Sequence, residues 1–148
     1  MKSVSIYALT RKQNLSNLSR LECHLSERDR PLKVRAWEIN SMRVLVDQLE
    51  KYMPEVYRLR LFYSFQILRL GKEFDLLQVK KNQIVNIELK SGAVSEDAIR
   101  RQLIQNRYYL SILGRPVRSY TYISSQNRLV RLTNHDHLVE AEWEQLCA

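Results

Sequence analysis

The sequence predicts a mixed α/β (α+β) domain in which a central β-sheet is flanked by helices. Its 148 residues suit a single domain that is large enough to bury a core. A hydrophobic content of 45% and a charged content of 27% are typical of soluble globular proteins. Helical and alternating patterns follow one another in the order α-β-β-β-α-β-β. We expect a polar extension over 1–35, a core over 36–133 and a C-terminal tail over 134–148.

Helical periodicity predicts one short helix and two long ones. Four leucines of the extension recur at helical spacing and predict an amphipathic helix that packs on the core or contacts a partner: Leu15, Leu18, Leu21 and Leu25. The first core helix is expected over 37–53, where apolar residues form one stripe and Pro54 marks the end. The second is expected over 96–113, with Ser95 as its N-cap and Gly114 just past its end.

Five segments have the patterns of β-strands. Residues 59–67 alternate and are rich in aromatic side chains, which predicts the first strand. Residues 74–79 and 84–89 are apolar and rich in β-branched side chains, which predicts the second and third. The fourth and fifth strands are expected over 118–125 and 128–133, on either side of a short turn.

The second and third strands form a hairpin whose register follows from its turn. If Lys81 and Asn82 make a two-residue turn, Asp75 lies directly opposite Glu88. Opposed residues share a sheet face, with β-carbons about 4.5–5.5 Å apart. Because side chains alternate along a strand, Lys90 joins Glu88 on that face. A four-residue turn with the same centre keeps this register, whereas a three-residue turn breaks it.

Two carboxylates and an amine on one sheet face suit a hard-cation site. Buried charges must be paired or bound to a metal. Mg²⁺ takes carboxylate oxygens and keeps several waters, and substrate phosphate usually completes its shell. The alternative is a surface ion pair of Lys90 with Glu88 or Asp75 on a solvated face. The carboxylates lie within strongly apolar strands, which favours the metal site over the ion pair.

This segment resembles the PD-(D/E)xK phosphodiesterase superfamily, the restriction-endonuclease-like nucleases. Asp75 matches the first acid of the family, and Glu88 and Lys90 match its E-x-K tripeptide; the resemblance covers roughly 37–131. It implies Mg²⁺ as cofactor, with Mn²⁺ as a substitute, bound by Asp75, Glu88 and the carbonyl of Leu89. It also implies that the metal activates water for attack on a phosphodiester. Lys90 is expected to orient that water and to offset negative charge.

Glu38 is a candidate for an additional acid at the site. It lies four residues before Met42, on the apolar stripe of the first core helix. Nucleases of the resembled superfamily often carry a further acid on this helix. An equally good explanation is that Glu38 lies at the helix N-terminus, where negative charge is favourable.

The second helix carries amides and tyrosines that suit a role beside the carboxylates. Gln102, Asn106 and Tyr109 are spaced to share one helix face. Gln105 and Tyr109 have the form Q-x-x-x-Y, which is similar to a motif that follows the E-x-K strand in RecB-type members of the superfamily. That resemblance implies a supporting catalytic role for both residues. In the alternative interpretation, the tyrosines are core aromatics and the amides are surface groups.

Basic residues favour a polyanionic partner. The net charge is +8, from 24 basic and 16 acidic residues, and such charge draws a protein to phosphate backbones without conferring sequence preference. On the second helix, Arg101 and Arg107 are candidates for nucleic-acid binding together with Gln102, although the arginines also fit a solvated face. The resemblance implies DNA in preference to RNA, and nothing in the residues excludes RNA.

Several other classes of protein are disfavoured. The longest apolar runs fall well short of the ~20 residues that span a bilayer, and the N-terminus lacks the apolar core of a signal peptide, so we expect a cytoplasmic protein with no membrane contact. Cys23 and Cys147 are too far apart to suggest a zinc site or a disulfide framework. His135-Asp136-His137 is best interpreted as a surface loop. The chain has no G-x-x-x-x-G-K-[ST] phosphate loop, so it carries no ATPase motor of its own.

The function expected from these observations is a Mg²⁺-dependent nuclease. Domains of the resembled kind are often joined to helicase or ATPase chains, so a partner of that class is one option, and a homodimer is another. A second hypothesis is a non-catalytic nucleic-acid-binding module on the same fold. A third is a protein-binding adaptor or inhibitor that uses the N-terminal leucine stripe as its interface.

Overall fold

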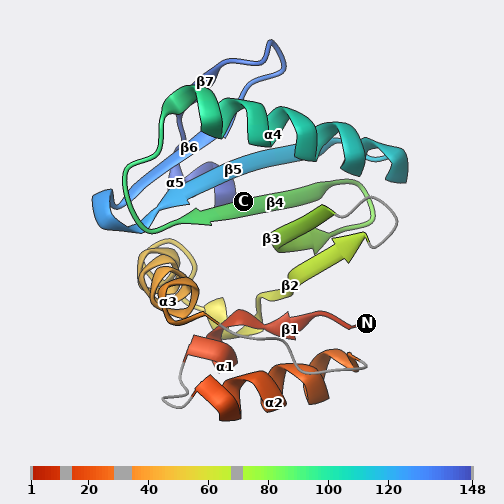
Figure 1. The fold of residues 1–148 in the computed structure, drawn as a ribbon, viewed down its shortest axis with the longest axis vertical. Helices are drawn as coiled ribbons and strands as arrows, with labels where there is room; N and C mark the ends of the chain where they lie inside the picture. Colours follow the sequence, from red (N-terminus) through yellow and green to blue (C-terminus); the bar gives the residue numbers. More distant parts are fainter. Residues whose placement is uncertain (1, 11–14, 29–34, 68–71, 148) are drawn as a thin grey trace.

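The computed structural model describes residues 2–10, 15–28, 35–67 and 72–147. Within these residues, the strands form one seven-stranded sheet in which each strand pairs with its neighbours in sequence (Figure 1). Its strands are β1 (Val4–Ser5), β2 (Arg60–Ile67), β3 (Lys72–Val79), β4 (Ile84–Lys90), β5 (Val117–Ile123), β6 (Arg128–Leu132) and β7 (Leu138–Glu140). The β4–β5 pair is parallel and the other pairs are antiparallel. The mixed α/β class predicted from the sequence is confirmed.

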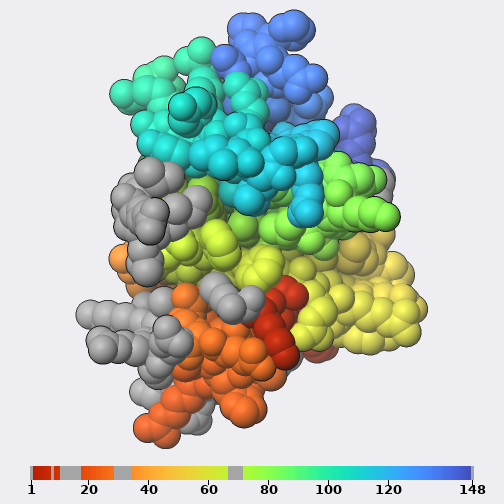
Figure 2. Space-filling model, turned by 90° about the vertical axis from the view of Figure 1, so that its right-hand side faces the viewer, coloured from red at the N-terminus to blue at the C-terminus, as the bar shows by residue number. Residues whose placement is uncertain are grey.

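Helices cover both faces of this sheet. They are α1 (Ile6–Thr10), α2 (Leu15–Ser26), α3 (Ala36–Glu50), α4 (Glu96–Leu110) and α5 (Trp143–Cys147). Short 3₁₀ turns are η1 (Val56–Arg58), η3 (Ser111–Leu113) and η4 (Ser124–Gln126). The crossover helix α4 joins the parallel strands β4 and β5 and lies along them (Figure 1). Figure 2 views the side on which α4 ends, with the β3–β4 turn beside it and α2 at the opposite end of the molecule.

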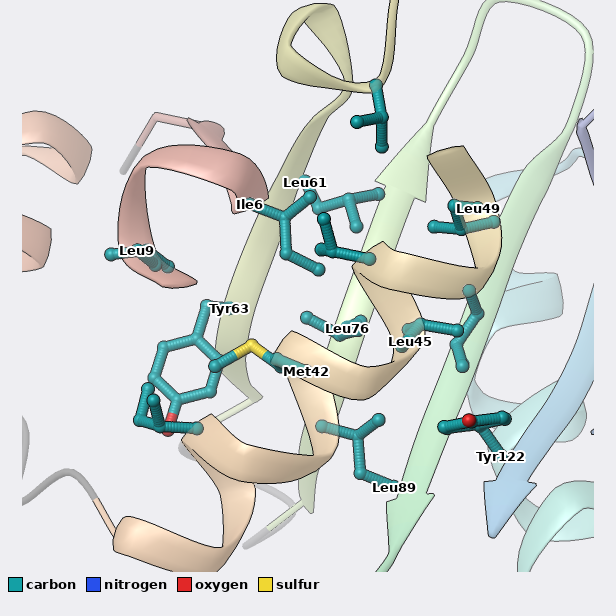
Figure 3. Close-up of a cluster of buried hydrophobic side chains, with 14 of the residues drawn as sticks. Ile6, Leu9, Met42, Leu45, Leu49, Leu61, Tyr63, Leu76, Leu89 and Tyr122 are labelled. Carbon is teal, nitrogen blue, oxygen red and sulfur yellow. The ribbon is translucent and has the colours of Figure 1, made fainter. Parts of the chain in front are cut away.

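The larger part of the core lies between the sheet and α3. Met42, Leu45 and Leu49 of α3 are fully buried against residues of the central strands, among them Leu76 and Leu89 (Figure 3). The stripe predicted for this helix is therefore its buried face. Burying each of these side chains contributes about 1.5–3 kcal/mol before entropy costs are subtracted.

The face of the sheet that carries α4 is covered by smaller apolar clusters. Ile99 and Leu103 of α4 pack against β5 and β6, while Leu110 packs against Phe74 and Ile84. Ser95 accepts a hydrogen bond of 3.1 Å from the backbone amide of Ala98, so the predicted N-cap is confirmed. The α-helix ends at Leu110, earlier than expected, and the chain continues to 113 as a 3₁₀ turn that closes on Gly114 with φ 73°. Glycine adopts this left-handed conformation at little cost.

The N-terminal residues are part of the fold. β1 pairs with the start of β2, and Val4, Ile6 and Leu9 are buried in the main core. The predicted leucine helix is α2, in which Leu18 is 1% exposed. Pro31 lies outside the described residues. The tail expected after 133 contributes β7 and α5, and Trp143 of α5 packs edge-on against Tyr122 at a centroid distance of 5.6 Å. These segments therefore pack on the same sheet and core as residues 36–133.

Candidate functional site

The ladder between β3 and β4 opens at Asp75 and Glu88. Val79 pairs with Ile84 and Leu76 with Ile87, which is the register predicted from a two-residue turn. One residue further along, the backbone amide of Asp75 donates a hydrogen bond of 2.9 Å to Glu88 Oε2. In return, the backbone amide of Leu89 donates one of 2.9 Å to Asp75 Oδ2. The two carboxylates thus replace main-chain carbonyls as acceptors between the strands.

The strict alternation assumed for this hairpin breaks at Asp75. Phe74 and Leu77 lie on the α4 face of the sheet, whereas Leu76 lies on the α3 face. The neighbouring strand β2 has a break at the same level, at Ser64, which lies opposite Asp75. Ser64 adopts φ 51°, a left-handed conformation that is rare for a residue with a side chain. The prediction that Asp75 and Glu88 share one face through regular alternation was therefore wrong. They meet instead in the space where the strands separate.

Glu88 is held by buried amide side chains on the α4 side. It is 1% exposed, and its Oε1 accepts a hydrogen bond of 3.1 Å from Gln102 Nε2. Asn86 Nδ2 donates to Glu88 Oε2 at 3.1 Å, and Asn106 Nδ2 donates to Asn86 Oδ1 at 3.0 Å. Burial and then repulsion from Asp75 raise the pKa of Glu88 to about 7, although the hydrogen bonds oppose the shift.

Asp75 faces charged groups from several elements. Burial is the largest cause that raises the pKa of its carboxyl, and Glu73 adds to it. The Leu89 amide and the positive charges of Lys90 and Arg35 lower that pKa. Lys90 is half-buried at the end of β4. The Lys90 amine therefore lies close enough to influence the Asp75 carboxyl, and its role at the site stays a prediction.

Glu38 lies in the first turn of α3 and also faces Asp75. It is 6% exposed. Burial and then repulsion from Asp75 raise the pKa of Glu38 to about 7, while the guanidinium of Arg35 opposes the shift. Glu38 therefore lies in the first turn of α3 and near Asp75, and its role as an additional acid stays a prediction.

Other residues at the site escaped the sequence analysis. Tyr63 lies in the core beside Met42 (Figure 3), and burial followed by repulsion from Glu38 and Asp75 raises the pKa of its phenol. The hydroxyl of Ser64 donates a hydrogen bond to Glu73. Only Asn86 had a detectable signal, since it lies two positions before Glu88 and alternation places both on one face.

The Q-x-x-x-Y pair does not contact the carboxylates. Gln105 is exposed, and its Oε1 accepts a hydrogen bond of 3.4 Å from Lys72 Nζ. The same amine lies 5.6 Å from the ring centroid of Tyr109, which packs against the cluster around Leu110. The amide that reaches Glu88 is that of Gln102. Helical periodicity accounts for the difference, because Gln102 and Asn106 share the face that looks at the sheet and Gln105 does not.

The predicted nucleic-acid contacts on α4 have different surroundings. Arg107 donates to the backbone oxygen of Thr133 at 3.2 Å and forms an ion pair with Asp136. Arg107 thereby fixes the loop that contains His135-Asp136-His137, in agreement with a surface loop. Arg101 is exposed and pairs with Asp97 at 3.2 Å, one helical turn away, which leaves it accessible to a partner.

The donor set of this site is compatible with Mg²⁺. Within the described ranges, no three His, Cys, Asp or Glu side chains are grouped so that they hold a metal ion. Mg²⁺ is usually bound by one or two carboxylates together with waters, so Asp75 and Glu88 are sufficient protein ligands. Burial raises the pKa of both carboxyls, and repulsion from neighbouring acids adds to it; a bound cation would offset that repulsion.

Comparison with known proteins identifies no relative of this chain. No protein-family model, curated protein or solved structure matches the chain. None of the helices in the described part of the chain has the length and apolar character that crossing a bilayer requires.

Proposed function

We propose that the chain is a Mg²⁺-dependent nuclease with a restriction-endonuclease-like core. The observation that carries the proposal is the reciprocal pair of hydrogen bonds that holds Asp75 and Glu88 together inside the opened hairpin. Buried carboxylates whose pKa values are raised destabilise a fold when they ionise. Such an arrangement is typical of functional sites, where perturbed pKa values cluster.

The residues that would hold Mg²⁺ are Asp75, Glu88 and the carbonyl of Leu89. A bound Mg²⁺ lowers the pKa of water and polarises a phosphoryl oxygen. Gln102 and Asn86 keep the Glu88 carboxylate oriented, so it does not have to reorganise when substrate binds. Lys90 supplies positive charge beside Asp75, where it orients the attacking water and offsets charge on the phosphate. Glu38 supplies a further buried acid.

The topology around the hairpin supports the same proposal. α3 precedes the β2–β3–β4 meander, and α4 then crosses over to β5, which runs parallel to β4. This order agrees with the αβββαβ core of the resembled superfamily. The net charge of +8 suits a nucleic-acid substrate, with DNA preferred to RNA.

The test is a cleavage assay with Mg²⁺ or Mn²⁺ on single- and double-stranded DNA and RNA. Asp75→Asn and Lys90→Gln should each reduce the rate by at least about 100-fold, because each removes a group at the reacting phosphate. Asp97→Asn is the matched control, since Asp97 is an exposed acid of α4 and its loss should leave the rate unchanged.

Two outcomes would contradict the proposal. Metal-dependent cleavage that persists at full rate in Asp75→Asn and Lys90→Gln would show that the activity comes from elsewhere. Binding of nucleic acid without cleavage, under every metal condition, would favour a non-catalytic binding module on this fold.

A further inference from the structure

A cavity lies between β5 and β6, on the side of β5 away from the β3–β4 hairpin. Pairing between β5 and β6 begins at Tyr120 and Arg131, and the residues beyond this pair diverge. A cavity of about 210 Å³ lies there. Among the residues that the structure describes, its lining includes Arg118, Arg131 and Asn134 and no acidic residue.

Arg118 is fixed in one orientation. Its Nη2 donates hydrogen bonds of 2.6 Å to the hydroxyl of Tyr120 and 2.6 Å to the backbone oxygen of Gln145. Its guanidinium carbon lies 5.5 Å from the centroid of the Tyr120 ring. These contacts occupy one nitrogen of the guanidinium, so Nε and Nη1 retain N–H groups for another acceptor.

Arg131 contributes a second guanidinium to the same cavity, on the sheet face that carries Arg118 and Tyr120. Within the part of the chain that the structure describes, the Arg131 guanidinium, which is half-buried, forms no hydrogen bond or ion pair. The cavity thus collects donors and offers no carboxylate to neutralise them.

We propose that this cavity binds a phosphate group. Guanidinium groups match the oxygens of phosphate with paired N–H donors, and hydrogen bonds to a charged group are the stronger class. The cavity is several times the ~30 Å³ that one water molecule occupies, so a polyatomic anion fits. The ligand is either free phosphate or a phosphate of a polynucleotide. The proposal does not depend on the nuclease assignment, because none of its residues belongs to the carboxylate site.

The test measures the rise in melting temperature of the full chain on adding inorganic phosphate or a short single-stranded oligonucleotide. Asp75→Asn serves as the background, so that the oligonucleotide stays intact. In that background, Arg131→Gln should weaken phosphate-dependent stabilisation by about tenfold in apparent Kd, which corresponds to one charge-assisted hydrogen bond. Arg58→Gln is the matched control, because Arg58 is an exposed arginine of η1 and carries the same charge.

Each shift is measured against the melting temperature of the same variant without ligand, so a change in basal stability does not obscure the result. Arg131→Lys keeps the charge but loses the planar fork, and it should give an intermediate shift. If only inorganic phosphate raises the melting temperature, the ligand is a free anion. If only the oligonucleotide raises it, the ligand is a phosphate of a polynucleotide backbone. The proposal fails if neither ligand stabilises the chain, or if Arg58→Gln weakens binding as much as Arg131→Gln.

Discussion

The backbone amide of Asp75 donates a hydrogen bond of 2.9 Å to the side chain of Glu88, the residue opposite it in the hairpin register. Main-chain amides within a sheet ordinarily bond main-chain carbonyls. Here the Glu88 carboxylate is the acceptor in place of a main-chain carbonyl, so the backbone of Asp75 fixes the Glu88 side chain. The geometry of the site is built into the strand pairing, so substitutions that alter this pairing should alter the acids as well.

Replacing Glu88 with Gln should stabilise the protein at high pH and have little effect at low pH. Below pH 4.5 the carboxyl is protonated in the folded and the unfolded chain. Between 4.5 and about 7 only the folded chain keeps the proton, so the free energy of unfolding falls as the pH rises. At pH 8 we therefore expect Glu88→Gln to be more stable than the wild type, by on the order of 2 kcal/mol.

The hydrogen bonds around Glu88 can accommodate that substitution. Gln102 Oε1 is buried and has no partner, so a rotation of the Gln102 amide lets it accept from the new side-chain amide. Chemical denaturation at pH 4 and pH 8 measures the effect, with the exposed residue Glu96 changed to Gln as control. A stabilisation that is equal at both pH values would contradict the role of ionisation.

Asn106→Leu should destabilise the protein, although leucine is close in volume and helix-compatible. The substitution removes the donor to Asn86 Oδ1 and leaves that buried oxygen without its partner, at a cost of about 1–3 kcal/mol. Gln105→Leu, on the exposed face of the same helix, should change stability by less than about 0.5 kcal/mol. Urea denaturation compares the two. Equal effects would mean that the buried amide pair does not hold α4 to the sheet.

Ser64→Val should destabilise the protein more than Ser64→Gly does. Ser64 has φ 51° within β2, and a β-branched side chain is strained in that conformation by about 1–3 kcal/mol. Glycine accepts the conformation readily, and both substitutions lose the hydrogen bond to Glu73. Their difference in melting temperature therefore isolates the backbone strain. If valine is tolerated as well as glycine, the break in alternation at Asp75 has another cause.

Arg28→Met should cost about 3–5 kcal/mol, because it leaves Glu22 buried without its cation. Glu22 is 1% exposed, Arg28 Nη2 lies 2.6 Å from its Oε1, and the same nitrogen donates to the backbone oxygen of Tyr63 at 2.7 Å. The double variant Glu22→Gln, Arg28→Met should recover part of the loss. The exposed pair of Lys2 and Glu27 provides the contrast, since Lys2→Met should cost less than about 1 kcal/mol. Thermal unfolding of the variants distinguishes the two pairs.

The sequence predicted the hairpin because its register depends on few variables. Once Lys81 and Asn82 form the turn, pairing runs from Val79 and Ile84 back along the strands, and apolar side chains on both faces keep it in place. The long helices were predictable for a similar reason. Each has an apolar stripe several turns long, and α4 also has a capping serine at its start and a glycine that ends the 3₁₀ turn after it.

The remaining elements lack such local signals. β1 has two residues and β7 has three, which is too short for alternation to be detected. The left-handed Ser64 depends on tertiary contacts, because serine in a strand pattern ordinarily indicates an extended residue. The choice of Gln102 over Gln105 depends on how α4 is rotated against the sheet. The buried face of α4, formed by Ile99, Leu103, Asn106 and Leu110, fixes that rotation.

β1 also decides how the sheet ends. It pairs with Leu61 and Arg60 at the start of β2, a strand that contains Phe62 and Phe65. An uncovered edge strand of this composition is a template for pairing with a second chain. β1 therefore covers the start of this edge, and removal of residues 1–5 should expose Arg60 and Leu61 and increase self-association of the chain.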